Sequence, residues 1–210
     1  MKKEAASALP TRARSTLDTE VRPADAGTRP VVWSIAGSDS GAGAGLQADL
    51  KALQAFGVHG CMAVAAITAQ NSVAVTRVEP VSAELLDAQL CALAQDMPPQ
   101  AIKTGLLGSA DNVRVVCQWV DRLRAQGQAV ALVVDPVLGS STGAAFANDA
   151  VRQAYVDELL PRATLITPNQ AEALRLGLAD SATQQALRAQ GVSLCITGGD
   201  ANDALSLIHI

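Results

Sequence analysis

Apolar residues in this chain fall into short runs, each of which leads into a glycine-rich or polar segment. The runs are VVWSIAG (31–37), CMAVAAITAQN (61–71), AIKTGLLG (101–108), AVALVVDPV (129–137), TLIT (164–167) and VSLCITGG (192–199). Short continuous apolar runs bounded by turn residues are typical of parallel strands buried on both faces. The pattern therefore predicts six buried strands.

Between these runs, apolar residues recur at helical spacing. Leu46, Leu50, Leu53 and Phe56 lie three or four residues apart, and Gly57 follows where a helix commonly ends on glycine. Further helices are predicted over residues 82–95, 110–126 and 149–160, from Asn169 onward, and over 183–190. Pro161 is expected to end the fourth of the six helices.

Strands that alternate with helices of ten or more residues predict an α/β fold with a mainly parallel sheet and helices on both faces. No internal repeat interrupts this alternation, so we expect one domain over residues 30–204. Residues 1–29 are polar, rich in Ala, Thr, Arg and Pro, and contain acidic as well as basic side chains. This composition predicts a disordered tail and neither a secretory signal nor a transit peptide.

Composition narrows the classes of function. The 210 residues carry 16 basic and 20 acidic side chains, a net charge of −4, and only five are aromatic. A basic face for nucleic acid and a base-stacking surface for single strands are therefore not expected. The longest apolar runs are far shorter than the roughly 20 residues that cross a bilayer. We expect a soluble protein without a nucleic-acid or membrane partner.

The four cysteines, Cys61, Cys91, Cys117 and Cys195, are scattered, and the chain has two histidines. The sequence contains no C-x-x-C pair, which would suggest a zinc site, so the thiols are interpreted as small buried hydrophobic groups. Unpaired cysteines of this kind favour a reducing compartment, and we expect a cytoplasmic protein.

Polar and glycine-rich residues follow almost every predicted strand. In parallel sheets, ligands bind at the carboxyl ends of the strands, so these segments predict a small-molecule site that takes a phosphate. The loop over residues 37–45 fits neither the dinucleotide pattern G-x-G-x-x-G nor the P-loop pattern, which requires G-K-[ST]. Its glycines still offer bare N–H groups beside a helix N-terminus.

Several of these segments together resemble the hydroxymethylpyrimidine and phosphomethylpyrimidine kinases of thiamine biosynthesis, which have a ribokinase-like fold. The segments are AGSDSGAGAGLQADLKALQAFGVHGCMAVAAITAQN (36–71), KTGLLGS (103–109), VVDPVLGSSTG (133–143), LITPNQAEA (165–173) and TGGD (197–200). They occur in the family's order and approximate spacing; GAGAG stands where the family usually has GGGAG. The resemblance implies a three-layer ribokinase-like fold and an ATP-dependent kinase whose substrates are hydroxymethylpyrimidine and its monophosphate.

The resemblance assigns the pyrimidine site to Gln70, Gly37, Ala44 and Val137. A carboxamide such as that of Gln70 offers an acceptor and two donors, which match a ring nitrogen beside an exocyclic amine. Gly37 and Ala44 correspond to backbone walls of the pocket, and Val137 to an apolar wall. Without the resemblance, a solvent-facing turn residue is the better interpretation of Gln70, and Val137 is equally well an ordinary core residue.

The resemblance assigns the nucleotide phosphates and Mg²⁺ to Asp135, Asn169, Glu172, Thr197 and Gly199. Hard oxygen ligands suit Mg²⁺. Asn169 and Glu172 also have the spacing of a helix capping box, and the two roles are compatible. For Asp49 and Lys51 we expect surface or capping roles, whereas Lys103 is a weaker candidate for contact with phosphates.

Kinases of this superfamily also carry a G-T-G-[CD] segment whose amides bind the transferred phosphoryl group, and this sequence has none. We therefore expect a fold that lacks its C-terminal elements, with no catalytic residue inside the chain. Residues 205–210, LSLIHI, are interpreted as non-native read-through. A pyridoxal kinase of the same superfamily and a non-catalytic pyrimidine-binding module remain alternatives, and a homodimer is possible.

Overall fold

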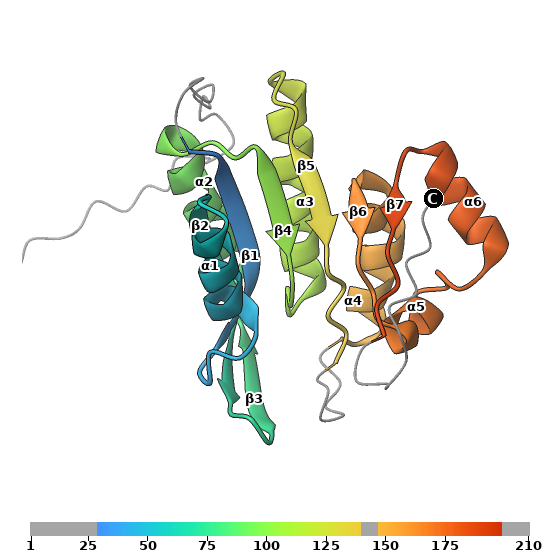
Figure 1. The fold of residues 1–210 in the computed structure, drawn as a ribbon, viewed down its shortest axis with the longest axis horizontal. Helices are drawn as coiled ribbons and strands as arrows, with labels where there is room; N and C mark the ends of the chain where they lie inside the picture. The colour runs from blue at the N-terminus through green and yellow to red at the C-terminus, as the bar shows by residue number, and fades with distance from the viewer. Residues whose placement is uncertain (1–28, 140–146, 199–210) are drawn as a thin grey trace, which may run out of the picture.

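A twisted sheet forms the centre of the protein in the computed structural model, which describes residues 29–139 and 147–198 (Figure 1). Its strands are β1 (Val31–Asp39), β2 (His59–Gln70), β3 (Val75–Pro80), β4 (Ala101–Thr104), β5 (Ala131–Val134), β6 (Leu165–Ile166) and β7 (Ser193–Leu194). They lie in the order β3-β2-β1-β4-β5-β6-β7. The predicted tail other than Arg29, and the predicted read-through segment, lie outside the described residues.

Every neighbouring pair in the sheet is parallel except β2 and β3. The six predicted strands are confirmed as β1, β2 and β4 to β7, although β6 and β7 are only two residues long. The antiparallel strand β3 was not predicted. It is an edge strand without a buried residue, so its sequence lacks the apolar run that marks the others.

The helices are α1 (Gly45–Ala55), α2 (Ala83–Asp96), α3 (Ala110–Ala125), α4 (Asp149–Ala154), α5 (Gln170–Arg175) and α6 (Ser181–Ala189). They match the predicted helices to within a few residues, and Gly57 follows the end of α1 with φ +70°. The fourth is shorter than predicted as an α-helix. After α4 the chain continues as a π-helical turn (Tyr155–Leu159) and a 3₁₀ turn (Leu160–Arg162) that contains Pro161.

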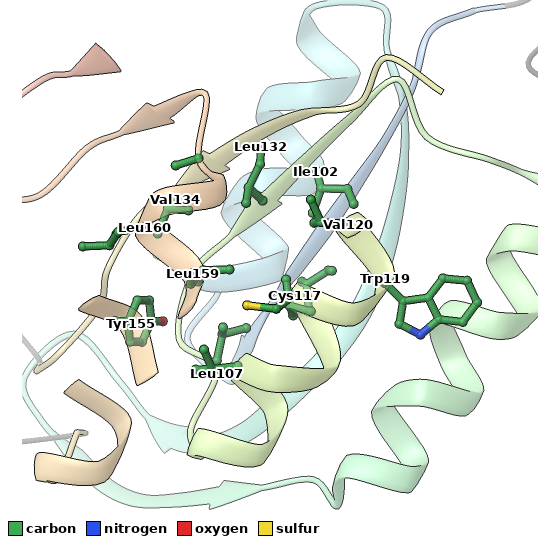
Figure 2. Packing of buried hydrophobic residues seen from close by; sticks show 14 of the residues in the cluster. Ile102, Leu107, Cys117, Trp119, Val120, Leu132, Val134, Tyr155, Leu159 and Leu160 are labelled. Atoms are coloured by element: carbon green, nitrogen blue, oxygen red, sulfur yellow. The ribbon is translucent and has the colours of Figure 1, made fainter. Parts of the chain in front are cut away.

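Helices cover both faces of the sheet, as predicted. Helix α1 packs against β1 and β2 on one face, where Ser34 of β1 bonds Asp49 of α1. The neighbouring residues of β1, Trp33 and Ile35, point to the opposite face and join the large apolar cluster there. Figure 2 shows part of that cluster, in which Cys117 and Val120 of α3 lie beneath Ile102 and Leu132 of the sheet.

The predicted apolar face of α1 is wrong in part. Leu46 is buried, but Leu50 is 47% exposed and Phe56 is 84% exposed. Leu46, Asp49 and Leu53 face the sheet, where Asp49 bonds Ser34 of β1 and Lys103 of β4. These polar contacts of Asp49 explain why a different face of α1 packs on the sheet from the one that the hydrophobic spacing predicts.

The direction of chain travel reverses beside β1. The chain runs from β1 through α1 to β2 and β3 on one side, then returns through α2 to β4 on the other side. The carboxyl ends of β1, β4 and β5 reach the same edge of the sheet (Figure 1). In open parallel sheets, ligands bind in the crevice at the carboxyl ends of the strands, at the point where the strand order reverses.

None of the helices in residues 29–139 and 147–198 has the length and apolar character needed to span a membrane.

Candidate active site

A pocket opens at this reversal point, beyond the carboxyl ends of β1, β2, β4 and β5. Its walls combine backbone and small side chains with a few polar groups. They are formed by Ala36, Gly37, Asp39, Ala44, Gly45, Thr68, Gln70, Lys103, Gly105, Leu106, Asp135, Val137 and Gly139. The structure therefore brings together Gln70, Gly37, Ala44, Val137 and Asp135, which are far apart in the sequence.

Gln70 is the last residue of β2, and its main chain is fixed. The Ser40 hydroxyl donates to the Gln70 carbonyl at 2.5 Å and accepts from the Gln70 N–H at 2.8 Å. The side-chain oxygen of Gln70 lies 3.5 Å from the hydroxyl of Thr68, which is at most a weak bond. The carboxamide is therefore held at the pocket wall with its hydrogen-bonding capacity largely unused by the described residues.

Close packing explains the small residues of this pocket. A Cβ atom added to Gly37 would lie 3.1 Å from Cδ2 of Leu106, and one added to Gly105 would lie 3.0 Å from Cβ of Ala36. Gly45 has φ +57°, and a Cβ there would lie 2.3 Å from the Gly37 carbonyl oxygen. Larger residues at these positions would shift the walls or fill the pocket.

Asp39 organises the loop between β1 and α1. Its Oδ1 accepts from the N–H of Gly41 at 2.8 Å, and its Oδ2 accepts from Gly43 and Ala44 at 2.9 and 2.8 Å. The N–H groups of the loop glycines were expected to be bare and available for a phosphate, and that expectation is wrong for Gly41 and Gly43. The signal that could have revealed Asp39 is an aspartate directly before a glycine-rich turn, where the carboxylate commonly bonds nearby N–H groups.

Lys103 lies at the end of β4 with its ammonium between two carboxylates. Nζ is 3.1 and 3.0 Å from the two oxygens of Asp49 and 3.7 Å from Oδ2 of Asp135. Asp49 also accepts a 2.5 Å bond from the Ser34 hydroxyl. The expected surface or capping role of Asp49 is therefore wrong: it is an inward-facing partner of Lys103. Lys51 is exposed and bonds the Ala42 carbonyl at 2.9 Å, as expected for a surface residue.

Burial raises the pKa of the Asp135 carboxyl above its usual value, and the ammonium of Lys103 opposes this shift. Asp49 adds to the increase because a second negative charge disfavours ionisation. The side chain of Asp135 is 38% exposed, so its oxygens can be reached from the pocket. Asp135 is thus an accessible carboxylate in the pocket that Gln70 also lines.

Asn169 and Glu172 form the predicted capping box at the start of α5. The Glu172 N–H donates to the Asn169 side chain at 2.9 Å, and the Asn169 N–H donates to Glu172 Oε2 at 3.0 Å. Glu172 also accepts from the Leu138 N–H at 3.4 Å, which ties it to the segment after Val137. Burial raises the pKa of the Glu172 carboxyl, and the nearby Asp135 raises it further.

The predicted nucleotide residues do not all line the pocket. Thr197 pairs with Asn169 in an isolated parallel bridge, and these two residues and Glu172 are not among the residues that line the pocket. Gly199 lies outside the described residues. Within those residues, no group of three or more His, Cys, Asp or Glu side chains could hold a metal. One accessible carboxylate, Asp135, still fits Mg²⁺, which commonly takes one or two carboxylates together with water and substrate phosphates.

Comparison with known proteins gives a consistent result. Residues 39–201 match the family described as phosphomethylpyrimidine kinase. A hydroxymethylpyrimidine/phosphomethylpyrimidine kinase from Synechococcus elongatus is 44% identical over 144 residues, which cover 69% of this chain and 53% of that protein. The corresponding enzyme of Rhizobium meliloti is 41% identical over 172 residues, covering 81% of this chain and 63% of that protein. The chain thus spans between about half and two thirds of the length of these relatives.

Solved structures agree. A phosphomethylpyrimidine kinase from Clostridium difficile superposes with a TM-score of 0.70 at 31% identity, covering 84% of this chain and 78% of that one. A pyridoxal kinase from Staphylococcus aureus in complex with ADP gives 0.68 at 32% identity, covering 85% and 66%. Both comparisons support the ribokinase-like fold expected from the sequence. The chain belongs to the phosphomethylpyrimidine kinase family.

Proposed function

We propose that the protein carrying this chain phosphorylates 4-amino-5-hydroxymethyl-2-methylpyrimidine, and its monophosphate, with ATP in thiamine diphosphate biosynthesis. The observation that carries the proposal is the shared pocket: Gln70, Gly37, Ala44 and Val137 line one cavity together with Asp135. These residues come from the ends of three strands, β1, β2 and β5, and the cavity lies where an open parallel sheet binds ligands.

The pyrimidine ring would lie against Gly37, Ala44 and Val137, with its polar edge toward Gln70. The Gln70 carboxamide can accept from the exocyclic amine and donate to the adjacent ring nitrogen. The bonds from Ser40 fix the backbone of Gln70, so the main chain does not have to be ordered when the ligand binds. This arrangement selects a ring with neighbouring donor and acceptor groups.

The nucleotide would lie on the side of Asp135 and the start of α5. Asp135 would hold Mg²⁺, and Asn169, Glu172, Thr197 and Gly199 would shape the phosphate-binding edge. When bound, Mg²⁺ neutralises charge on the phosphate oxygens as the phosphoryl group is transferred. The capping box of Asn169 and Glu172 supports this part of the proposal, because it fixes α5 through backbone bonds.

A cytoplasmic location and a homodimeric assembly are part of the same proposal. All four cysteines are free thiols, which fits a reducing compartment.

The proposed homodimer rests on exposed apolar residues: Ile67 of β2 and Val73 in the turn before β3 are 57% and 76% exposed. Exposed apolar residues on one hairpin are compatible with a contact between two copies.

The second candidate is a pyridoxal kinase. The observation that favours it is the similarity to the Staphylococcus aureus pyridoxal kinase crystallised with pyridoxal, with a TM-score of 0.67 at 31% identity. Pyridoxal also carries a hydroxymethyl group on an aromatic ring. It lacks the exocyclic amine that Gln70 would recognise.

A competition assay tests the proposal. The protein carrying this chain is incubated with Mg·ATP and equal concentrations of hydroxymethylpyrimidine and pyridoxal, and the products are identified by mass spectrometry. We expect the pyrimidine monophosphate to form first and the diphosphate to follow. Faster formation of pyridoxal phosphate would favour the second candidate, and phosphorylation of neither compound would contradict kinase activity.

A further inference from the structure

The pocket has a single cationic residue among its described walls, Lys103. Its position is fixed from two elements: the side chain leaves β4, and Asp49 of α1 holds the ammonium at 3.0 and 3.1 Å. The Ser34 hydroxyl in turn fixes Asp49. Gly105 gives the ammonium room, since a Cβ there would lie 3.2 Å from Nζ.

The ammonium retains donor capacity toward the pocket. Lys103 has three N–H donors, its side chain is 25% exposed, and Asp135 at 3.7 Å is beyond normal hydrogen-bond distance. An oxygen atom of a ligand could therefore bind between Lys103 and the open side of the pocket. Lys103 is thus a cation of fixed position that can still donate a hydrogen bond to a ligand in the pocket.

Three backbone donors near the N-terminus of α1 that could bind an anion are already used. The N–H groups of Gly41, Gly43 and Ala44 all donate to Asp39, which removes them from the N-terminus of α1. The remaining charged walls, Asp39 and Asp135, are acidic. A phosphate in the cavity would meet net repulsion from these carboxylates unless a cation compensated for it.

We propose that Lys103 recognises the phosphate of the pyrimidine monophosphate and so determines whether the pocket accepts the phosphorylated as well as the unphosphorylated ring. The proposal rests on the proposed function, since it names the residue that admits the second substrate. A phosphomonoester carries a charge of about −1.5 to −2 near neutral pH, and a positioned ammonium forms a charge-assisted hydrogen bond with it. The unphosphorylated hydroxymethyl group needs no such partner.

Calorimetry with two ligands tests this assignment. Hydroxymethylpyrimidine and its monophosphate are titrated separately into the 210-residue chain, its Lys103→Met variant and a matched control, Lys51→Met. Lys51 lies on α1, is exposed and does not line the pocket. For Lys103→Met we expect the affinity for the monophosphate to fall about ten- to a hundredfold, with little change for the unphosphorylated ring. Lys51→Met should bind both ligands like the wild type.

A second variant guards against misfolding, because Lys103→Met leaves the Asp49 carboxylate without its cation. The double variant Lys103→Met with Asp49→Asn removes both charges and keeps an oxygen that can accept from Ser34. It should show the same selective loss of the monophosphate. An equal loss of both ligands, or no loss of the monophosphate, in a folded variant would overturn the role of Lys103 alone. Failure of the wild type to bind either pyrimidine would instead contradict the proposed function on which it rests.

Discussion

Gln70 combines a fixed backbone with a side chain that has few partners. Ser40 bonds both backbone groups of Gln70, while the carboxamide makes only a 3.5 Å contact with Thr68 among the described residues. The carboxamide lines the pocket and is available to pair with a ligand, while the main chain that carries it is already ordered. Its effect on binding should therefore be separable from any effect on stability.

Replacement of Gln70 by alanine should weaken the binding of hydroxymethylpyrimidine by about 1–3 kcal/mol, because the polar edge of the ring loses its partner. The affinity for ATP should change little, since the proposed nucleotide residues lie on other strand ends. Calorimetry measures both affinities, and Gln54→Ala, an exposed position on α1, is the control. Unchanged pyrimidine binding in Gln70→Ala would refute the assignment.

Gly45 and Gly57 have similar backbone conformations in different surroundings, which makes them a matched pair. Both have positive φ, +57° and +70°, but a Cβ at Gly45 would lie 2.3 Å from the Gly37 carbonyl oxygen, whereas a Cβ at Gly57 meets nothing within 4 Å. Gly57→Ala should cost about 1 kcal/mol for the left-handed conformation. Gly45→Ala should cost about 3 kcal/mol or more, since β1 and α1 must also separate. Urea denaturation measures both, and equal losses would show that the close approach is unimportant.

At the scale of whole elements, the side chain of Asn112 in α3 is hydrogen-bonded to three other segments of the chain. Its fully buried amide nitrogen lies 3.2 Å from the Ala65 carbonyl of β2, 3.2 Å from the Val81 carbonyl before α2, and 2.9 Å from the Leu107 carbonyl after β4. Leu107 directly follows Leu106, a wall of the pocket. The strand that carries Gln70 and the loop that carries Leu106 are therefore joined through one side chain.

The chemistry of this contact can be tested with two nearly isosteric variants. Asn112→Asp places a carboxylate opposite three carbonyl oxygens, and we expect a loss of about 3 kcal/mol or more in the free energy of unfolding. Asn112→Leu removes the donor together with the amide oxygen, which has no partner among the described residues, and should cost less. Chemical denaturation at neutral pH compares them. If aspartate were tolerated as well as leucine, the amide would not be the fastening group.

At the scale of the whole molecule, the alternation of elements and the position of the pocket could be predicted from the sequence. Apolar runs followed by glycine-rich segments identify strand ends, and strand ends converge at one edge of a parallel sheet. The contact between Lys103 and Asp49 could not be predicted, because it joins residues 54 apart through the packing of α1 on the sheet. The same packing explains why Leu50 is exposed although its spacing predicts burial.

The apolar interior also determines the reactivity of the cysteines. Cys61, Cys91 and Cys117 are buried, as predicted, whereas Cys195 is only partly buried. Burial raises the pKa of the Cys117 thiol from 9.0 to about 11. Between pH 9.0 and about 11, Cys117 therefore stays protonated in the native state but loses its proton in the unfolded chain. The free energy of unfolding should decrease as the pH rises through this range.

Alkylation followed by mass spectrometry makes this observable. In the native protein at pH 8–9, iodoacetamide should modify Cys195 first and leave Cys117 largely unmodified, since the buried thiol is both protonated and inaccessible. Urea-unfolded chain serves as the control and should react at all four cysteines. Rapid modification of Cys117 under native conditions would mean that α3 does not pack on the sheet as Figure 2 shows.

The central claim is that the pocket at the carboxyl ends of β1 and β4, where the strand order reverses, is a pyrimidine site. A crystal structure of the chain with hydroxymethylpyrimidine bound is its most direct test. The account predicts the ring between Gly37, Ala44 and Val137, with its amino group and ring nitrogen paired to the Gln70 carboxamide and its hydroxymethyl group toward Lys103 and Asp135. A ring bound elsewhere, or a pocket that stays empty in crystals saturated with the ligand, would contradict it.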